Sequence, residues 1–188
     1  MRTVIATGVA VLLLASAVRA ELVPANPEGH RIMIEVGSIP APDGWKAFCI
    51  SWPGECRSVP RTRPVVLTER LWKELELVNR RVNSEIRYVD DPVGDVWSLP
   101  VDEGDCEDFV LLKRKRLVER GWPPGALLVT VVVAPDGRGH SLLTVRTDRG
   151  EFVLDNNTSR ILEWVDTPYT FMSRQSSSNP NQWAALDR

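Results

Sequence analysis

The apolar segment 126–134 constrains the fold of this 188-residue chain more than any other feature. It contains a single polar residue, a threonine, and such a near-continuous apolar run is expected of a central strand buried on both faces. Turn-forming residues at 135–139 and 148–150 separate two further predicted strands, 140–147 and 151–155. The C-terminal half should therefore contain an antiparallel sheet.

Two helices are predicted ahead of this sheet, and Thr68 is a good N-cap for the first. Residues 83–89 extend this helix or begin a connection. Residues 21–63 are rich in proline and glycine and show little periodicity, so we expect an irregular N-terminal lobe there. The apolar stripe of the helix, at spacings of three and four, consists of Leu71, Trp72, Leu75, Val78 and Val82.

The second predicted helix begins at Asp105, an N-cap residue with Asp108 three positions beyond it as an acidic variant of the capping box. It ends at Gly121, ahead of two prolines. Its basic run, 113–116, lies late in the helix, where it suits the helix dipole, and is interpreted as a solvated face. Helices packed on an antiparallel sheet indicate an α+β fold.

The first twenty residues have the pattern of an export signal. Arg2 supplies a positive start, 4–18 is mostly apolar, and a small-x-small cleavage site ends at Ala20. We expect a signal peptide at 1–20, cleaved after Ala20, and a single domain over 21–188 in the periplasm or outside the cell; the alternative is an uncleaved anchor. A net charge of −2 argues against nucleic acid as the main partner.

Cysteine usage fits an exported protein. Cys49 and Cys56 flank Trp-Pro-Gly, a natural turn for closing a small disulfide loop. That pairing leaves Cys106 unpaired in an oxidising compartment, which is typical of a reactive thiol. The alternative is that all three cysteines are buried thiols.

Cys106, His140 and Asp155 follow one another in the order of a nucleophile, a base and an orienting acid. The chain has two histidines, and His140 on a strand is a better platform for a base than His30 in the irregular N-terminal stretch. Helix-dipole stabilisation and a neighbouring histidine both favour the thiolate. The alternative is that Cys106 is a small buried apolar residue.

The hairpin between the last two predicted strands provides an internal test, because His140 and Asp155 must share one face. A two-residue turn at 148–149 places Asp155 opposite Leu142 and diagonal to His140. A three-residue turn would place it opposite Leu143, on the wrong face. A catalytic triad therefore requires an even-length loop or a compensating bulge.

Acidic residues crowd the stretch 90–108, which holds eight of the chain's 25 carboxylates. Asp105, Glu107 and Asp108 should raise the pKa of the Cys106 thiol and oppose its ionisation. A divalent cation would remove this conflict, and clustered carboxylates suit Ca²⁺. The pattern is not that of an EF-hand. The alternative is that the acids only stabilise the start of a helix.

The motifs around these residues resemble the bacterial transglutaminase-like cysteine peptidases, over about residues 35–185. The resemblance implies a papain- and transglutaminase-like fold, with a nucleophile helix on an antiparallel sheet, and the triad Cys106, His140 and Asp155. Other similar segments are Arg63–Thr68, Val78–Asn83 and Arg174–Ser176. The matching site motifs are Gly104-Asp105-Cys106-Glu107-Asp108-Phe109, Gly139-His140 and Val153-Leu154-Asp155-Asn156.

The best-studied branch of that family, the LapG-type proteases, adds further expectations. Its members are periplasmic and calcium-dependent, cut large surface adhesins to release biofilm cells, and are sequestered by an inner-membrane cyclic-di-GMP receptor. The carboxylates that bind calcium there correspond to Asp105 and Glu107, with Asp108 as a third candidate. Papain-type enzymes carry an oxyanion glutamine where this chain has Pro100, so the expected donors are the Cys106 N–H and, more remotely, Trp97.

Three functions fit this sequence. The preferred one is an exported cysteine endopeptidase acting on a protein substrate. A transglutaminase, which transfers the acyl group from glutamine to an amine, would use the same triad through the same thioester. The third is a papain-like module that binds a partner without catalysis.

Overall fold

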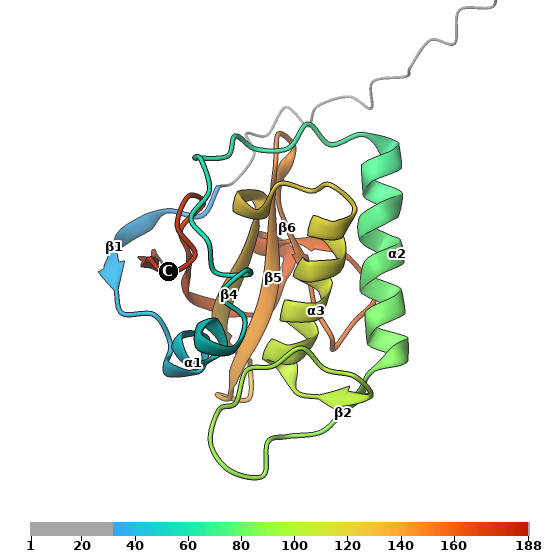
Figure 1. Cartoon of the computed structure of the whole chain (residues 1–188). Helices are drawn as coiled ribbons and strands as arrows, with labels where there is room; N and C mark the ends of the chain where they lie inside the picture. Colours follow the sequence, from blue (N-terminus) through green and yellow to red (C-terminus); the bar gives the residue numbers. More distant parts are fainter. Residues whose placement is uncertain (1–31, 188) are drawn as a thin grey trace, which may run out of the picture.

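The computed structural model describes residues 32–187, so the signal-peptide prediction for 1–20 and the alternative base His30 lie outside the described residues. A seven-stranded antiparallel sheet forms the centre of the molecule, in the order β1-β9-β8-β4-β5-β6-β7 (Figure 1). A small parallel pair, β2 (Arg87–Tyr88) and β3 (Glu103–Gly104), lies outside it. The main-sheet strands are β1 (Glu35–Ile39), β4 (Leu127–Val133), β5 (Gly139–Thr147), β6 (Gly150–Leu154), β7 (Leu162–Glu163), β8 (Thr170–Gln175) and β9 (Trp183–Leu186).

Within residues 32–187, three α-helices accompany the sheet: α1 (Asp43–Ser51), α2 (Glu69–Glu85) and α3 (Cys106–Glu119). Helix α3 packs on β4 and β5, and α2 packs against α3 (Figure 1). This arrangement confirms the α+β prediction, with the cysteine at the start of the helix on the sheet. Among the described residues, none of the helices combines the length and the apolar character needed to cross a bilayer.

Helix α2 forms as its sequence predicts. The Thr68 side chain accepts a hydrogen bond from the Leu71 N–H at 3.3 Å, which caps the helix. Leu75, Val78 and Val82 of the apolar stripe are buried against the core. The helix continues to Glu85, which settles the choice left open for residues 83–89 in favour of an extension followed by β2.

Helix α3 departs from the predictions in two respects. Asp105 occupies the N-cap position but makes no capping hydrogen bond through its side chain, so the expected capping box is wrong. The prediction of a solvated basic face is wrong for half of the run, because Lys113 is fully buried and the Arg114 guanidinium reaches inward to the Leu127 carbonyl and to Glu55. Lys115 and Arg116 are partly exposed and pair with Glu119 and Glu85. A helix packed between a sheet and other elements has little free surface, and charge patterning does not reveal this.

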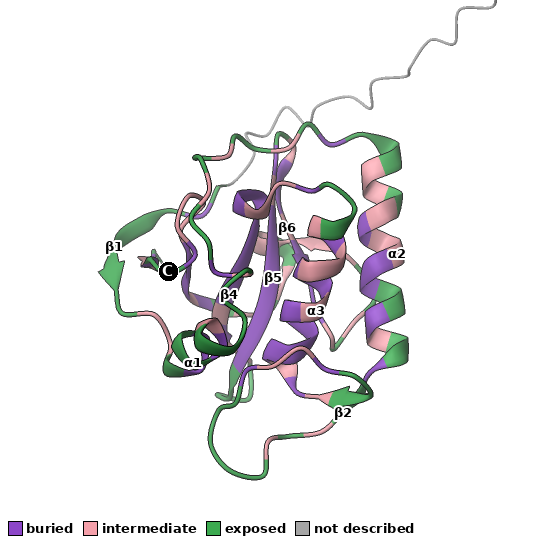
Figure 2. Cartoon of the chain, in the orientation of Figure 1, coloured by how far each residue is buried: buried purple, intermediate pink, exposed green. Residues whose placement is uncertain are grey.

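The sheet confirms the expected strand order in its central part. β4 lies between β5 and β8, as a strand buried on both faces should. β5 and β6 are joined by a two-residue turn, since Thr147 pairs with Gly150 and Leu143 pairs with Leu154. This even-length turn is the one that places His140 and Asp155 on a common face. Figure 2 shows the central strands and α3 as the most buried part of the molecule.

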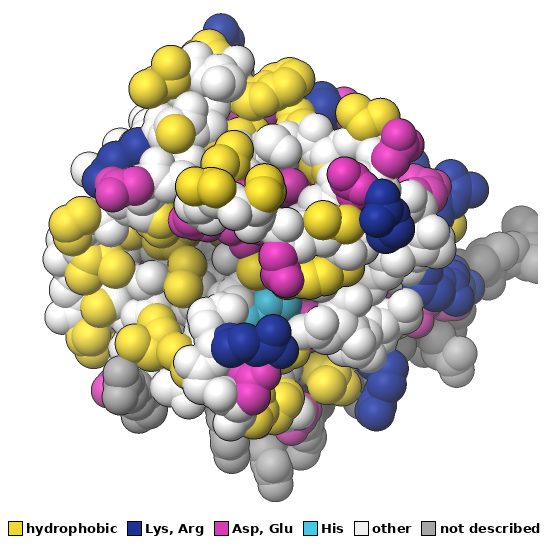
Figure 3. Space-filling view, turned by 90° about the horizontal axis from the view of Figure 1, so that it is seen from below, with side chains coloured by type: hydrophobic (Ala, Val, Ile, Leu, Met, Phe, Trp, Pro, Cys, Tyr) yellow, Lys and Arg dark blue, Asp and Glu magenta, His cyan; other side chains and the backbone are white. Residues whose placement is uncertain are grey.

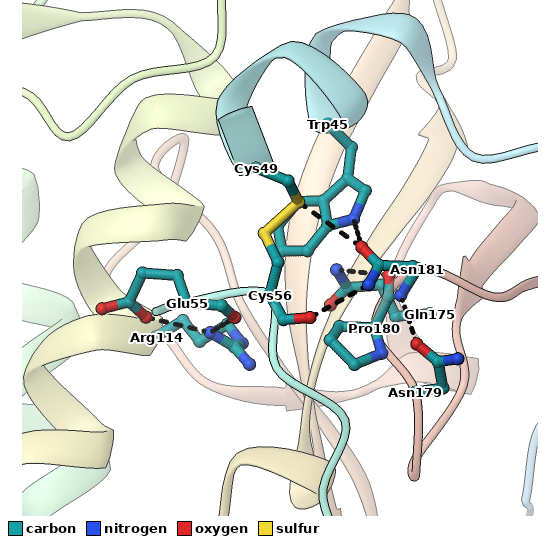
Figure 4. The surroundings of a disulfide bond; sticks show 9 residues. All are labelled: Trp45, Cys49, Glu55, Cys56, Arg114, Gln175, Asn179, Pro180 and Asn181. Atoms are coloured by element: carbon teal, nitrogen blue, oxygen red, sulfur yellow. Dashed lines mark hydrogen bonds and ion pairs between the residues drawn. A yellow bond between two sulfur atoms is a disulfide. The ribbon is translucent and has the colours of Figure 1, made fainter. Parts of the chain in front are cut away.

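The N-terminal lobe is more regular than its composition suggests. Residues 35–39 form the edge strand β1 and 43–51 form α1, so the prediction of an irregular lobe is wrong for these segments. The predicted disulfide joins Cys49 of α1 to Cys56 (Figure 4). Asn181 links this loop to the C-terminal segment, because it accepts a hydrogen bond from the Trp45 indole and donates one to the Cys56 carbonyl.

Candidate active site

Cys106 and His140 line the same cavity, which has a volume of about 310 Å³. Cys106 begins α3 and His140 is the second residue of β5, so the helix start and the strand start meet here. Seen from below, the one described histidine lies in a hollow surrounded by hydrophobic, acidic and basic side chains (Figure 3). Other lining residues are Asn83, Ile86, Tyr88, Phe109, Arg138 and Asn157.

His140 and Asp155 form a buried pair, with 2.9 Å between Nε2 and Oδ1. The other carboxylate oxygen accepts a hydrogen bond from the Tyr169 hydroxyl at 2.6 Å, and Oδ1 also accepts one from the Asn157 N–H at 2.9 Å. Burial acts to raise the pKa of Asp155, but the hydrogen bonds from His140, Tyr169 and Asn157 outweigh it and hold this pKa below its usual value. Asp155 is therefore a carboxylate at neutral pH.

The imidazole is fixed from several sides. The Tyr169 ring packs against it, with 5.4 Å between ring centroids, and the Asn157 amide lies 3.3 Å from Nε2. Because Nε2 faces Asp155, Nδ1 is the ring nitrogen left to exchange a proton with a nucleophile. The sheet thus presents a base with a defined orientation.

Two asparagines of α2 hold the loop that follows Asp155. The Asn83 amide donates to the Asp155 carbonyl at 2.8 Å, and the Asn79 amide donates to the carbonyls of Thr158 and Ser159 at 3.3 Å. These contacts give a structural reason for the motif Val78–Asn83, because α2 ties the acid-bearing loop to the helical layer.

The Cys106 thiol, in contrast, lies in an environment that opposes its ionisation. Cys106 is half-buried and is a free cysteine, and its Sγ lies 2.8 Å from Glu107 Oε2. Burial and the Glu107 carboxylate raise the pKa of the Cys106 thiol far above its ordinary value, against a smaller opposing effect of the Ser141 N–H. These surroundings favour the protonated thiol, and a positive charge near Glu107 would favour the thiolate.

Carboxylates face one another next to the thiol. Burial, together with the charges of Asp91 and Asp95, raises the pKa of Asp105 to about 6. Burial and a hydrogen bond with Asp95 raise that of Glu107 to about 8. One buried oxygen of Asp105, Oδ1, has no hydrogen-bond partner in the described structure. Such mutual repulsion and an unsatisfied oxygen are expected where a cation belongs.

Asp108, the third expected metal ligand, is directed elsewhere. Its carboxylate accepts hydrogen bonds from the Ser98 N–H at 2.7 Å and from the Ser98 hydroxyl at 3.3 Å. Within residues 32–187, no three His, Cys, Asp or Glu side chains already converge on a single metal position. The four carboxylates Asp91, Asp95, Asp105 and Glu107 lie close enough to affect one another's charge, and carboxylate oxygens are ligands of the kind that Ca²⁺ prefers.

The two nominated oxyanion donors differ in their availability. The Trp97 indole N–H is bound to Asp95 Oδ1 at 2.9 Å, so it is not free to stabilise an oxyanion. The Cys106 N–H lies at the N-terminal end of α3, where backbone N–H groups lack helical partners. The helix start is therefore the better donor.

Comparisons with known proteins bear on this geometry. Residues 35–188 match the family model described as bacterial transglutaminase-like cysteine proteinase. The chain belongs to this family. Its members are cysteine peptidases, and the expected family resemblance is confirmed.

Solved structures give the same picture of the fold. Calcium-bound LapG of Legionella pneumophila is 27% identical with a TM-score of 0.51, covering 55% of this chain and 64% of that one. EGTA-treated LapG from the same organism is 26% identical with a TM-score of 0.53, covering 63% and 68%. The first match spans slightly less than two thirds of the LapG chain. A comparison with curated proteins gives no match.

Sequence reasoning missed several residues that surround the predicted triad. Tyr169 and Asn157 hold the His140–Asp155 pair, and Asp91 and Asp95 face the carboxylates beside Cys106. The available signal was weak: the two aspartates belong to the acidic stretch 90–108, whereas Tyr169 has no neighbouring motif.

Proposed function

We propose that this protein is a cysteine endopeptidase whose catalytic triad is Cys106, His140 and Asp155. The observation that supports it most is the buried His140–Asp155 pair, 2.9 Å apart, at the same cavity as a free cysteine at a helix start. Membership in a cysteine peptidase family supports the same chemistry. Asp155 orients the imidazole and stabilises its cation.

In the proposed reaction, the Cys106 thiolate attacks the carbonyl carbon of the scissile peptide, and His140 carries the proton removed from sulfur. The tetrahedral oxyanion accepts a hydrogen bond from the Cys106 N–H. His140 then donates its proton to the leaving amine, and a thioester remains on Cys106. A water molecule, deprotonated by His140, hydrolyses the thioester, releases the new carboxyl terminus and restores the thiol.

We further propose that Ca²⁺ binds Asp105 and Glu107, with Asp91 and Asp95 completing the set, and that Asp108 fixes the preceding loop through Ser98. The raised pKa values of Asp105 and Glu107 and the unsatisfied Asp105 Oδ1 support this site. A bound calcium ion would neutralise the repulsion and draw Glu107 away from the thiol. The calcium-bound state of the similar LapG structure points the same way.

The biological setting that we propose follows the LapG-type branch. The protein would act in the periplasm or outside the cell after cleavage behind Ala20, and the Cys49–Cys56 disulfide is consistent with an oxidising compartment. Its substrate would be a large surface adhesin and its regulator an inner-membrane cyclic-di-GMP receptor. Acyl transfer to an amine is the rival outcome, which an added amine acceptor would reveal as a transamidated product.

Alkylation of Cys106 tests thiol activation without a known substrate, because it is the free cysteine of the structure. We expect iodoacetamide to modify the wild-type thiol rapidly at pH 7 with calcium, and at least tenfold more slowly in His140→Ala or after EGTA treatment. Glu107→Gln should weaken the calcium response, whereas the neighbouring Asp108→Asn should retain it. Equal alkylation rates with and without EGTA would refute the calcium requirement, and equal rates in His140→Ala would refute the base.

Cleavage itself is tested with a mixture of unstructured peptides analysed by mass spectrometry. Wild-type protein with calcium should produce new termini, and Cys106→Ala should produce none while retaining the wild-type circular dichroism spectrum. Cleavage by the alanine variant would exclude the proposed nucleophile.

A further inference from the structure

Trp97 belongs to the acidic loop, residues 90–102 of the acidic stretch, and its ring packs against the N-terminal lobe. Its ring is buried against Trp45 of α1, with 6.1 Å between centroids, and against Trp183 of β9, at 6.3 Å. Gly44 of α1 accommodates the indole: a Cβ atom there would overlap the ring and come within 2.5 Å of its Nε1. The position of the indole is therefore determined by two separate elements, α1 and β9.

The polar edge of the same indole acts on the proposed metal site. Trp97 Nε1 donates to Asp95 Oδ1 at 2.9 Å, and Asp95 also makes a side-chain hydrogen bond to Glu107. A second aspartate of the loop, Asp91, is restrained in a similar way, because its Oδ2 accepts a hydrogen bond from the Val96 N–H at 2.6 Å. Each of these two aspartates is thus held by an N–H donor from its own loop, which restricts the orientation of its carboxylate.

We infer that Trp97 is a positioning residue for calcium, which holds Asp95 in place as a ligand and connects the disulfide-bonded lobe to the metal site. This inference rests on the calcium site of the proposed function. Asp95 is itself an exposed loop residue, and an unrestrained carboxylate would lose conformational freedom on binding the ion. Groups that orient ligands in this way typically change metal affinity by about 10–100-fold when they are removed.

The inference also assigns a role to the N-terminal lobe. Gly44 and Trp45 belong to α1, which the Cys49–Cys56 bridge and Asn181 fasten to the rest of the molecule (Figure 4). The indole thus connects α1 to a loop that also contacts α3 through Asp95 and Ser98.

Isothermal titration of Ca²⁺ into the purified protein tests this role. We expect Trp97→Phe to raise the dissociation constant about tenfold, while the matched control Trp72→Phe, which alters a tryptophan of α2 packed on Phe152, leaves it unchanged. Gly44→Ala, which displaces the indole, should follow Trp97→Phe. Melting temperatures measured in EGTA reveal any general loss of packing.

A double-mutant cycle separates positioning from a general structural effect. Asp95→Asn should itself weaken binding, and Trp97→Phe should then add less than a twofold further loss in the Asp95→Asn background, because its action passes through Asp95. Fully additive losses, or equal affinities in Trp97→Phe and Trp72→Phe, would overturn the inference and leave the calcium site standing. If wild-type protein binds no calcium, the proposed calcium site is refuted, and the positioning role of Trp97 is refuted with it.

Discussion

The two sides of the active-site cavity differ in how complete they are. On the sheet side, His140 and Asp155 are bonded to each other, and Tyr169 and Asn157 satisfy the remaining acceptor positions. On the helix side, the Cys106 thiol is directed to Glu107, and carboxylates repel one another with one oxygen unsatisfied. The proposed base is already oriented by hydrogen bonds, whereas the surroundings of the proposed nucleophile favour its protonated form.

This difference suggests where control of the enzyme lies. A preorganised base needs no ligand, and its residues are held by backbone and side-chain hydrogen bonds that the fold itself supplies. The nucleophile needs its neighbouring negative charge to be neutralised before it ionises. Regulation by a cation would therefore act through the helix side, and damage to the sheet side would not be repaired by adding calcium.

The largest expected effect on kcat comes from Asp155→Asn, which alters the preorganised sheet side of the cavity. The substitution keeps the shape but removes the charge that stabilises the imidazolium, so we expect kcat to fall about 10³–10⁴-fold at every calcium concentration. Peptide cleavage assays with a calcium titration measure this. A defect that excess calcium corrects would contradict the separation of the two sides.

Tyr169→Phe should have an intermediate effect. It removes the 2.6 Å hydrogen bond to Asp155 and keeps the ring that packs on His140. A hydrogen bond to a charged group is worth about 1.5–3 kcal/mol, so a decrease in kcat of roughly tenfold or more is expected, with KM unchanged. Tyr88→Phe, at the exposed rim of the same cavity, is the matched control and should change kcat less than twofold. A change in KM alone would show that Tyr169 acts on substrate binding.

The smallest expected effect is on stability and comes from replacing Lys113. It belongs to α3 but interacts with the charge of Asp155, and its buried ammonium has no hydrogen-bond partner among the described residues. Burial lowers the pKa of Lys113 to about 7. The unfolded chain therefore binds the additional proton between about pH 7 and 10.4, and the destabilisation by Lys113, complete below pH 7, disappears as the pH rises.

Lys113→Met should accordingly raise the free energy of unfolding at pH 7, by about 1–3 kcal/mol. The advantage over wild type should shrink from pH 7 to pH 10 in chemical denaturation experiments. Lys115→Met, on the same helix but paired with Glu119, should show no such trend. A wild-type-like pH dependence in Lys113→Met would mean that the amine is not the group responsible.

The sequence was most informative where geometry follows from counting residues. The two-residue turn between Thr147 and Gly150 was one of two options, and it is the one that puts His140 and Asp155 on one face. The Thr68 cap and the Cys49–Cys56 bridge are likewise local features that follow from residue type and spacing. The catalytic roles of the triad and of the three carboxylates stay predictions.

Sequence reasoning failed where tertiary packing decides the outcome. Lys113 and Arg114 look like a solvated basic face, and burial on several sides of α3 reverses that reading. Strand β1 was missed because its sequence has little periodicity. It forms by pairing with β9 at the other end of the described chain. The fold of the sheet brings the Tyr169 hydroxyl to Asp155, and no local sequence pattern predicts such a contact.

The pairing of β1 with β9 has a consequence for how the protein matures. Glu35 and Leu186 are register partners although they lie about 150 residues apart, so closing this loop costs far more chain entropy than forming the β5–β6 hairpin. Helix α3 and strands β4 to β6 are consecutive in the chain, and the predicted triad lies within this segment or, for Asp155, directly after β6. We expect this segment to fold early and the sheet edge to close last. During folding, the segment that holds the predicted triad would thus be largely assembled before the two ends of the described chain pair.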